Sequence, residues 1–304
     1  MNIVSTNLKT HLLLILATFF WGINPILMKI ALAEIDIIPF SVLRLFAGFL
    51  TALIIMLLSR NREKIELRDR ILILVIGIFG FFIFQLNYTV GVNYTSASIS
   101  AIILATLPVF VLIINFFTRM EKLSVRLIMG VVLSFLGVFI ISAGSSRGFS
   151  IEGTYTVGVV LLVIGEAAYA YYMVKSKILI NKYSIGQVLF NIITISFVLF
   201  IIIYIPRFSI SDFTGVSIKV WLGIVFSGVF SMAIANVMWY YGIRRLGTSR
   251  TAIYGNLPPV FGITAGFIFL GETLALLQVV GAVVIGIGII LVNRKKCLIH
   301  YTIH

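Results

Sequence analysis

One acidic residue, Glu166, stands inside a long apolar run that spans about 156–176. If this run is an α-helix, Glu166 lies roughly 15 Å from its start, because each residue adds about 1.5 Å. An ionised carboxylate at such depth is costly unless it is paired or hydrated, so Glu166 is a candidate functional group. Burial favours the protonated form of a carboxyl group, which makes Glu166 a candidate carrier of a coupling proton. The alternative is a hydrogen-bonded carboxyl that ties this helix to a neighbour.

A second charged group, Arg44, lies about 9 Å into the apolar run 38–58 by the same helical rise. Its planar guanidinium suits bidentate recognition of a carboxylate. Three arrangements are therefore open: Arg44 pairs with Glu166, it meets a carboxylate of a substrate, or its side chain extends to the membrane surface.

Amide, hydroxyl and aromatic side chains recur near the middle of several other apolar runs. A buried amide needs a partner, so these side chains either bond between helices or line water. Aromatic rings with a few amides suit a flat organic molecule or an amino acid, and packing or a place in the interfacial belt is the alternative. Beside Arg44 and Glu166, the candidates for a binding cavity are Trp21, Asn24, Asn87, Tyr88, Thr106, Tyr169, Asn191, Asn236, Trp239, Tyr240 and Asn256.

Prolines within the apolar runs predict helix kinks, because each proline removes one backbone hydrogen bond. A kink either exposes backbone carbonyls to a polar cavity or is a packing bend, which membrane helices tolerate. The kinks are expected at Pro25, Pro108, Pro258 and Pro259.

The composition indicates that these runs fold in a membrane. Hydrophobic residues make up 61% of the 304 residues and charged residues 11%, whereas soluble domains contain about 25% charged residues. Runs of about 18 to 23 apolar residues, each long enough to cross the bilayer, can be placed ten times. None alternates like a barrel strand. The predicted helices are 11–33, 38–58, 71–92, 96–118, 126–143, 156–176, 186–205, 218–243, 248–270 and 275–293.

The basic residues set the orientation of these helices. With the amino terminus in the cytoplasm, most of the 23 Lys and Arg residues fall in cytoplasmic loops, and only Arg147, Arg207 and Lys219 fall in outer loops. An even number of crossings then places both termini in the cytoplasm. The net charge of +13 is explained by this placement, so no nucleic-acid partner is expected.

The stretch 91–142 recurs later in the chain without a gap, so that Pro108 returns as Pro259 and Glu121 as Glu272. Because five crossings per half is an odd number, the second half enters the membrane from the opposite side. Such inverted repeats are typical of secondary transporters that hold substrate between the halves. Glu121 and Glu272 stand at helix ends, where we expect them to cap or tie neighbouring helices rather than to bind substrate.

Several kinds of chemistry find no support in the sequence. The single cysteine, Cys297, excludes an intrachain disulfide, and the three histidines show no metal-ligand spacing, so neither a metal nor a cofactor is expected. No phosphate-binding loop is present, so ATP is not the direct energy source. No nucleophile and base converge beside Glu166, which disfavours an intramembrane enzyme and leaves no catalytic residue to name.

Four motifs carry a family resemblance: Trp21-Gly22-x-Asn24-Pro25, Pro39-x-x-x-x-Arg44, Tyr94-Thr95-Ser96-Ala97-Ser98 and Leu246-Gly247-Thr248-Ser249. With them the chain resembles the drug/metabolite transporter superfamily, specifically its EamA-type ten-helix carriers. The resemblance implies a multi-pass carrier of the plasma (inner) membrane with a central cavity. It also implies two EamA-like five-helix repeats, over 11–143 and 156–293.

The expected fold is therefore an all-α integral membrane protein, with ten transmembrane helices as two inverted five-helix repeats around a central cavity. The expected function is secondary transport, with export of amino acids or other small organic metabolites by alternating access. Multidrug or toxic-compound efflux and metabolite uptake are the alternatives. The lipid bilayer and a small organic substrate are the expected partners, while cargo, direction, coupling ion and oligomeric state stay open.

Overall fold

The computed structural model describes residues 3–59, 63–95, 97–143, 153–209, 214–262, 264 and 276–293. Glu272, Cys297 and the end of the run expected over 248–270 lie outside this part of the chain. Every element in the described residues is a helix. Within the described ranges, seven helices are long and apolar enough to cross a membrane, and two shorter apolar helices cover Ile102–Thr118 and Val125–Ile140.

The first half of the chain folds into long and short helices in succession. It begins with α1 (Ile3–Ala31) and α2 (Ile37–Leu58). A continuous crossing follows, composed of α3 (Leu67–Val75), the π-helix η1 (Ile76–Phe82) and α4 (Ile83–Tyr94). The half ends with α5 (Ala97–Leu104), α6 (Leu107–Thr118) and α7 (Val125–Ala143).

The second half repeats this order. It begins with α8 (Gly153–Lys182), α9 (Ile185–Tyr204) and the short η2 (Ile205–Arg207). The next crossing consists of α10 (Ile218–Val225), the π-helix η4 (Phe226–Ile234) and α11 (Ala235–Leu246). The half continues with α12 (Thr248–Ala252) and η5 (Ile253–Asn256), and its last described helix is α14 (Leu276–Asn293).

Two of the expected helices are interrupted. The run 96–118 breaks between α5 and α6, and the run 248–270 breaks at Leu257, after which a helix resumes at Pro258. Pro108 lies in the first turn of α6, where its missing N–H costs least, and Pro258 and Pro259 begin the resumed helix. Pro25, in contrast, lies inside α1, which continues through it.

The two π-helices lie near the middle of the helices Leu67–Tyr94 and Ile218–Leu246, and glycines in them let neighbouring helices approach closely. A Cβ added to Gly80 of η1 would stand 2.6 Å from the Cβ of Tyr172 on α8. Gly228 of η4 lies directly against the carbonyl oxygen of Arg44 on α2. Such π segments often occur next to functional sites.

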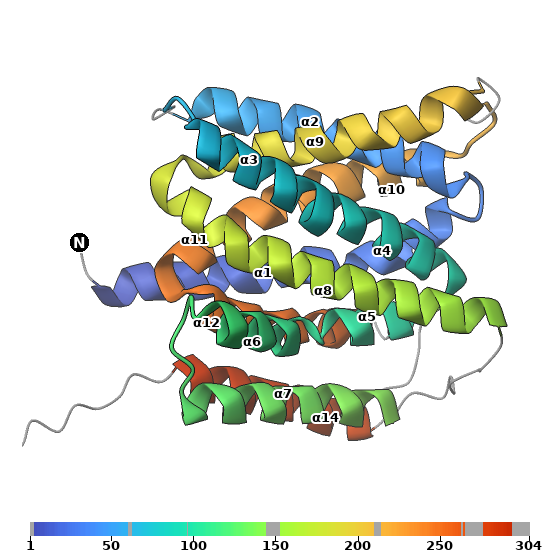
Figure 1. Cartoon of the computed structure of the whole chain (residues 1–304). Helices are drawn as coiled ribbons and strands as arrows, with labels where there is room; N and C mark the ends of the chain where they lie inside the picture. The colour runs from blue at the N-terminus through green and yellow to red at the C-terminus, as the bar shows by residue number, and fades with distance from the viewer. Residues whose placement is uncertain are drawn as a thin grey trace, which may run out of the picture.

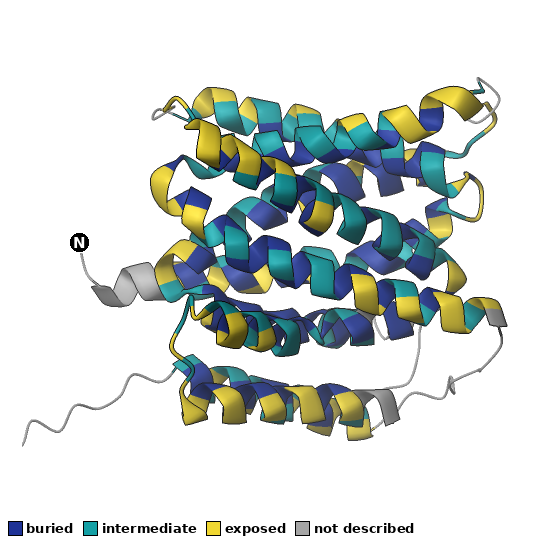
Figure 2. Ribbon diagram, viewed as in Figure 1, coloured by how far each residue is buried: buried dark blue, intermediate teal, exposed yellow. Residues whose placement is uncertain are grey.

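The helices form one bundle (Figure 1), with α2 beside α9 at one edge and α7 beside α14 at the other. Glycines allow the last pair to pack closely, because a Cβ on Gly137 would stand 2.7 Å from the carbonyl oxygen of Gly281. Figure 2 shows buried residues in the middle of the bundle and exposed ones along α7 and α14. Many exposed residues are apolar, such as Phe139 and Leu276, as expected of surfaces that face lipid.

The bundle has two distinct ends. We call one the basic end, because it carries the loops 63–66 and 119–124 and the α11–α12 junction at Gly247, each next to Lys or Arg residues. It lies on the left in Figure 1, as does the N-terminus. The opposite end carries the turn 32–36 and the segment 214–217.

Candidate functional site

A cavity lies among α1, α2, α4, α8, η4, α11 and the two helix breaks. Both breaks contribute to its wall, since Leu104 and Leu107 flank the first and Gly255 and Pro258 flank the second. The residues expected to form a cavity that do line it are Trp21, Asn24, Arg44, Tyr88, Glu166, Tyr169, Asn236 and the kink residue Pro258.

Arg44 is buried, with 2% of its surface exposed. Its Nη2 donates to Gln85 Oε1 at 2.9 Å and to Thr89 Oγ1 at 2.6 Å, and its Nη1 donates to Ser227 Oγ at 3.3 Å. These acceptors are neutral, and Nε has no hydrogen-bond partner in the described structure. Arg44 therefore neither reaches the membrane surface nor pairs with Glu166, and both of those expected arrangements are wrong. A buried guanidinium held by neutral groups favours an anionic partner in the cavity.

Glu166 is equally buried, with 2% exposed, and lines the same cavity. No described side chain donates a hydrogen bond to its carboxyl group, and no described basic group lies within ion-pair distance of it. Tyr88 and Tyr169 lie close enough to Glu166 to interact with it electrostatically. The cavity thus holds one cationic and one acidic group that do not neutralise each other.

Aromatic rings form one wall of the cavity. The ring centroids of Trp21 and Tyr169 lie 5.8 Å apart in an edge-on arrangement, and those of Phe84 and Tyr169 lie 4.6 Å apart. The hydroxyl of Tyr169 donates to Asn236 Oδ1 at 3.0 Å, which fixes the ring. Trp21 Nε1 donates to the carbonyl oxygen of Ser231 at 2.9 Å, so the first and second halves of the chain meet here.

The remaining candidates lie outside the cavity. Asn87, Thr106 and Asn191 donate to carbonyl oxygens of their own helical turns. Asn191 lines a separate groove between α3 and α9. The remaining three are Trp239, which packs behind Trp21 at 4.6 Å; Tyr240, whose hydroxyl lies 3.1 Å from Ser176 Oγ; and Asn256, which is fully buried.

Several cavity residues were not among the candidates. Gln85 holds Arg44, and its spacing of four residues from Thr89 on α4 would have placed both on one helical face. Ser227 and Ser231 lie on η4, and their signal was a pair of serines in an otherwise apolar run. Phe84, Leu104, Leu107, Met232 and Gly255 have no such signal, because apolar and glycine residues occur throughout the chain.

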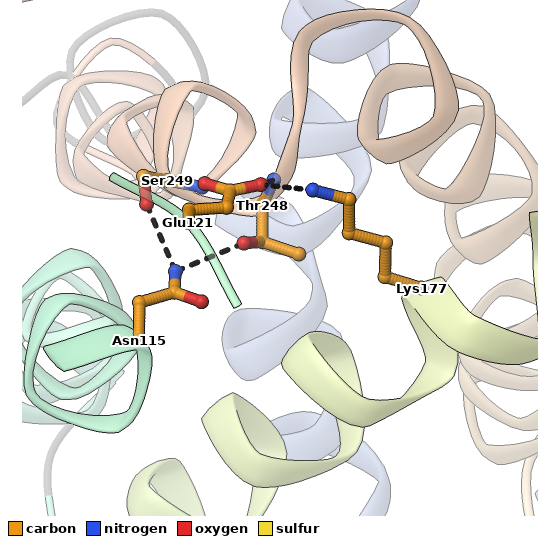
Figure 3. A network of polar contacts seen from close by, with 5 residues as sticks. All are labelled: Asn115, Glu121, Lys177, Thr248 and Ser249. Atoms are coloured by element: carbon orange, nitrogen blue, oxygen red, sulfur yellow. Dashed lines mark hydrogen bonds and ion pairs between the residues drawn. The ribbon is translucent and has the colours of Figure 1, made fainter. Parts of the chain in front are cut away.

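A second polar cluster lies at the basic end (Figure 3). Glu121 Oε1 accepts from Lys177 Nζ and from the backbone N–H of Thr248, both at 2.6 Å, and Oε2 accepts from the N–H of Ser249 at 3.0 Å. Asn115 Nδ2 donates to the hydroxyls of Thr248 and Ser249 at 3.0 and 2.9 Å. We call these five residues the Glu121 cluster. They confirm that Glu121 ties neighbouring helix ends.

The backbone around the Glu121 cluster is specialised. Arg119 ends α6 with a φ of 54°, a left-handed conformation that turns the chain before Glu121. Gly247 has a φ of 88°, and a Cβ there would stand 2.6 Å from Glu121 Oε1. Burial alone would raise the pKa of Glu121, but the hydrogen bonds from Lys177, Ser249 and Thr248 lower it overall, so the carboxylate stays ionised.

A simpler contact joins the two halves at the opposite end. The carboxylate of Glu34 accepts from the backbone N–H of Ser217 at 3.0 Å and from its hydroxyl at 2.9 Å. These hydrogen bonds lower the pKa of Glu34, the backbone one most. Glu34 is exposed, and Ser217 directly precedes α10.

The family and the relatives that this chain resembles are all described as transporters. The EamA-like transporter family matches twice, over residues 8–143 and 156–294. An uncharacterized transporter of Archaeoglobus fulgidus is 28% identical over 95% of this chain and 100% of its own length. The uncharacterized transporter YvbV of Bacillus subtilis is 31% identical over 95% of this chain and 92% of its own length.

The fold has a counterpart among solved structures. One crystal structure superposes with a TM-score of 0.77 over 93% of this chain and 98% of its own, at 15% sequence identity. Together, the family matches and the long apolar helices indicate a transporter rather than an enzyme. The chain belongs to the EamA-like transporter family and is a multi-pass membrane transporter.

Proposed function

We propose that this chain is a secondary transporter of the plasma membrane that exports amino acids or other small organic metabolites by alternating access. The observation that carries the proposal is that Arg44 and Glu166 are both buried and line one cavity without pairing. An amino acid carries both complementary charges. Its carboxylate would bind Arg44, its ammonium group would face Glu166, and its side chain would lie against the rings of Trp21 and Tyr169.

The topology of the proposal has ten crossings in two inverted five-helix repeats, over 11–143 and 156–293. Three observations support it. The family matches twice over nearly these ranges, the interruptions after Leu104 and Asn256 occur at equivalent places, and η1 and η4 do too. Under the positive-inside rule the basic end is cytoplasmic, and so are both termini.

Alternating access is supported by the composition of the cavity wall. Arg44 comes from the first half of the chain and Glu166 from the second, while Trp21 bonds to Ser231 across the boundary. A site shared by two halves is exposed to either side when one half rocks against the other.

The test is counterflow of labelled solutes into liposomes that contain the purified protein. We expect uptake of at least one amino acid. Arg44→Gln should reduce this uptake by about 10- to 100-fold, because a charge-assisted hydrogen bond is lost. Asn191→Ala, outside the cavity, is the matched control and should transport normally. Folded wild-type protein that exchanges no amino acid or aromatic metabolite would contradict the proposal.

The alternatives are separated by the same assay. A multidrug exporter of organic cations would keep its transport in Arg44→Gln and lose it in Glu166→Gln. An uptake carrier would accumulate solute in intact cells, whereas an exporter would deplete it. A coupling proton on Glu166 predicts that Glu166→Gln alters the pH dependence of transport, and an unchanged pH profile would remove the proton from the proposal.

A further inference from the structure

The Glu121 cluster joins three parts of the chain that also line the cavity. Glu121 follows α6, which begins at the cavity residue Leu107. Lys177 lies on α8, eleven residues and roughly 16 Å from Glu166. Thr248 begins α12, which leads through η5 to the cavity residue Gly255. Separation of these three elements at the cluster would therefore open a path from the cavity to the basic end.

Both oxygens of the Glu121 carboxylate accept hydrogen bonds, and the ion pair is shielded from solvent. The Glu121 side chain is 15% exposed and that of Lys177 is 25% exposed. One carboxylate receives an ammonium group and two backbone N–H groups, so its departure would leave all three donors to find other partners. Charge-assisted hydrogen bonds of this kind are about twice as strong as neutral ones.

The opposite end has a weaker counterpart. There the carboxylate of Glu34 accepts hydrogen bonds from Ser217 and interacts electrostatically with Lys219. It does so in an exposed position, where solvent competes for the same hydrogen bonds. The two carboxylates therefore hold the two ends unequally. Of these two described contacts, the one at Glu121 has more donors and is the more shielded.

We propose that the Glu121 cluster is the lock of the basic end, and that release of the Glu121 carboxylate from Lys177 and from the start of α12 is the step that opens the cavity to that side. The inference rests on the proposed alternating-access function. Glu121 is a positioning residue in this account, because it touches no substrate and acts through the helices that it joins.

The test measures access to the cavity and needs no known substrate. In a Cys297→Ser background, Ser231→Cys places one reporter thiol in the cavity, and a membrane-impermeant maleimide is applied to right-side-out and inside-out vesicles. Glu121→Ala should raise the labelling rate from the basic end by at least about 5-fold. The loss of these hydrogen bonds increases the fraction of molecules whose cavity is open at that end. Lys177→Met, which keeps the two N–H contacts, should raise the labelling rate less.

Glu34→Ala is the matched control, and it should raise labelling only from the opposite end. The proposal is overturned if Glu121→Ala protein with a normal melting transition labels from the basic end at the wild-type rate, or if Glu34→Ala gives the same increase there. If Glu121→Ala does not fold, Glu121→Gln and Lys177→Met decide in the same way. A failed counterflow assay with a clear change in sided labelling would contradict the choice of substrate and leave the lock standing.

Discussion

The two ends of this transporter use the same chemistry with different strength. At each end a carboxylate from the first half of the chain accepts hydrogen bonds from residues that precede or begin a helix of the second half. Glu121 does so in a shielded position with a lysine partner. Glu34 does so in an exposed position with a single serine. If the ends open alternately, as we propose, we expect the burial and number of donors, rather than the type of contact, to decide which end opens more easily.

Cross-linking the basic end so that it cannot open is expected to change transport more than any other variant. Asn115→Cys and Ser249→Cys, whose native side chains meet at 2.9 Å, can be joined by a short bifunctional thiol reagent in the Cys297→Ser background. Counterflow should fall to background, because the cavity cannot open at the basic end, and a reducing agent should restore it if the linker is cleavable. Each single-cysteine variant, treated identically, is the control. Continued exchange in the joined protein would rule out an opening at the cluster.

Replacing each of the two glutamates by alanine should show how much each carboxylate contributes to the stability of the folded protein. Glu121→Ala should lower the free energy of unfolding by about 1–3 kcal/mol, since shielded donors lose a charged acceptor. Glu34→Ala should leave the melting temperature in detergent unchanged within error, because exposed contacts of this kind contribute little. Equal shifts in the two variants would mean that the ends are held equally.

Lowering the pH should have the smallest effect on access to the cavity from the basic end. The pKa of Glu121 lies below its ordinary value of 4.5, so its stabilising contribution is complete above that value and is lost only as the pH falls through the lowered pKa. Labelling of the cavity thiol from the basic end should stay constant from about pH 8 to about pH 5.5 and rise only in more acid solution. A transition near neutral pH that Glu121→Gln abolishes would show that the carboxyl titrates there and contradict this assignment.

The sequence predicted the family, the helical membrane fold and the role of Glu121, because each depends on local features. Run length and charge placement identify crossings, and a glutamate at a helix end indicates capping. It did not predict the partner of Glu121, since Lys177 lies 56 residues away and only the packing of α8 against the end of α6 brings them together.

The cavity was predicted only in part, because it too depends on contacts between residues far apart in the sequence. The depth of Arg44 and Glu166 followed from helical rise, but whether they meet depends on which neighbours reach them, and Gln85 and Thr89 reach Arg44 first. The π-helices η1 and η4 were not predicted, because an apolar run looks the same in an α- and a π-helix. Glycines within them, Gly80 and Gly228, pack directly against α8 and α2.

In the proposed mechanism, one cavity opens alternately at the two ends of the bundle. This alternating opening is tested most directly by labelling Ser231→Cys, in the Cys297→Ser background, from each side of sealed vesicles. We predict that the thiol is reached from both sides, more slowly from the basic end, and that Glu121→Ala and Glu34→Ala raise the rates at the basic and opposite ends respectively. Labelling from one side only, in the parent and in both variants, would contradict the account.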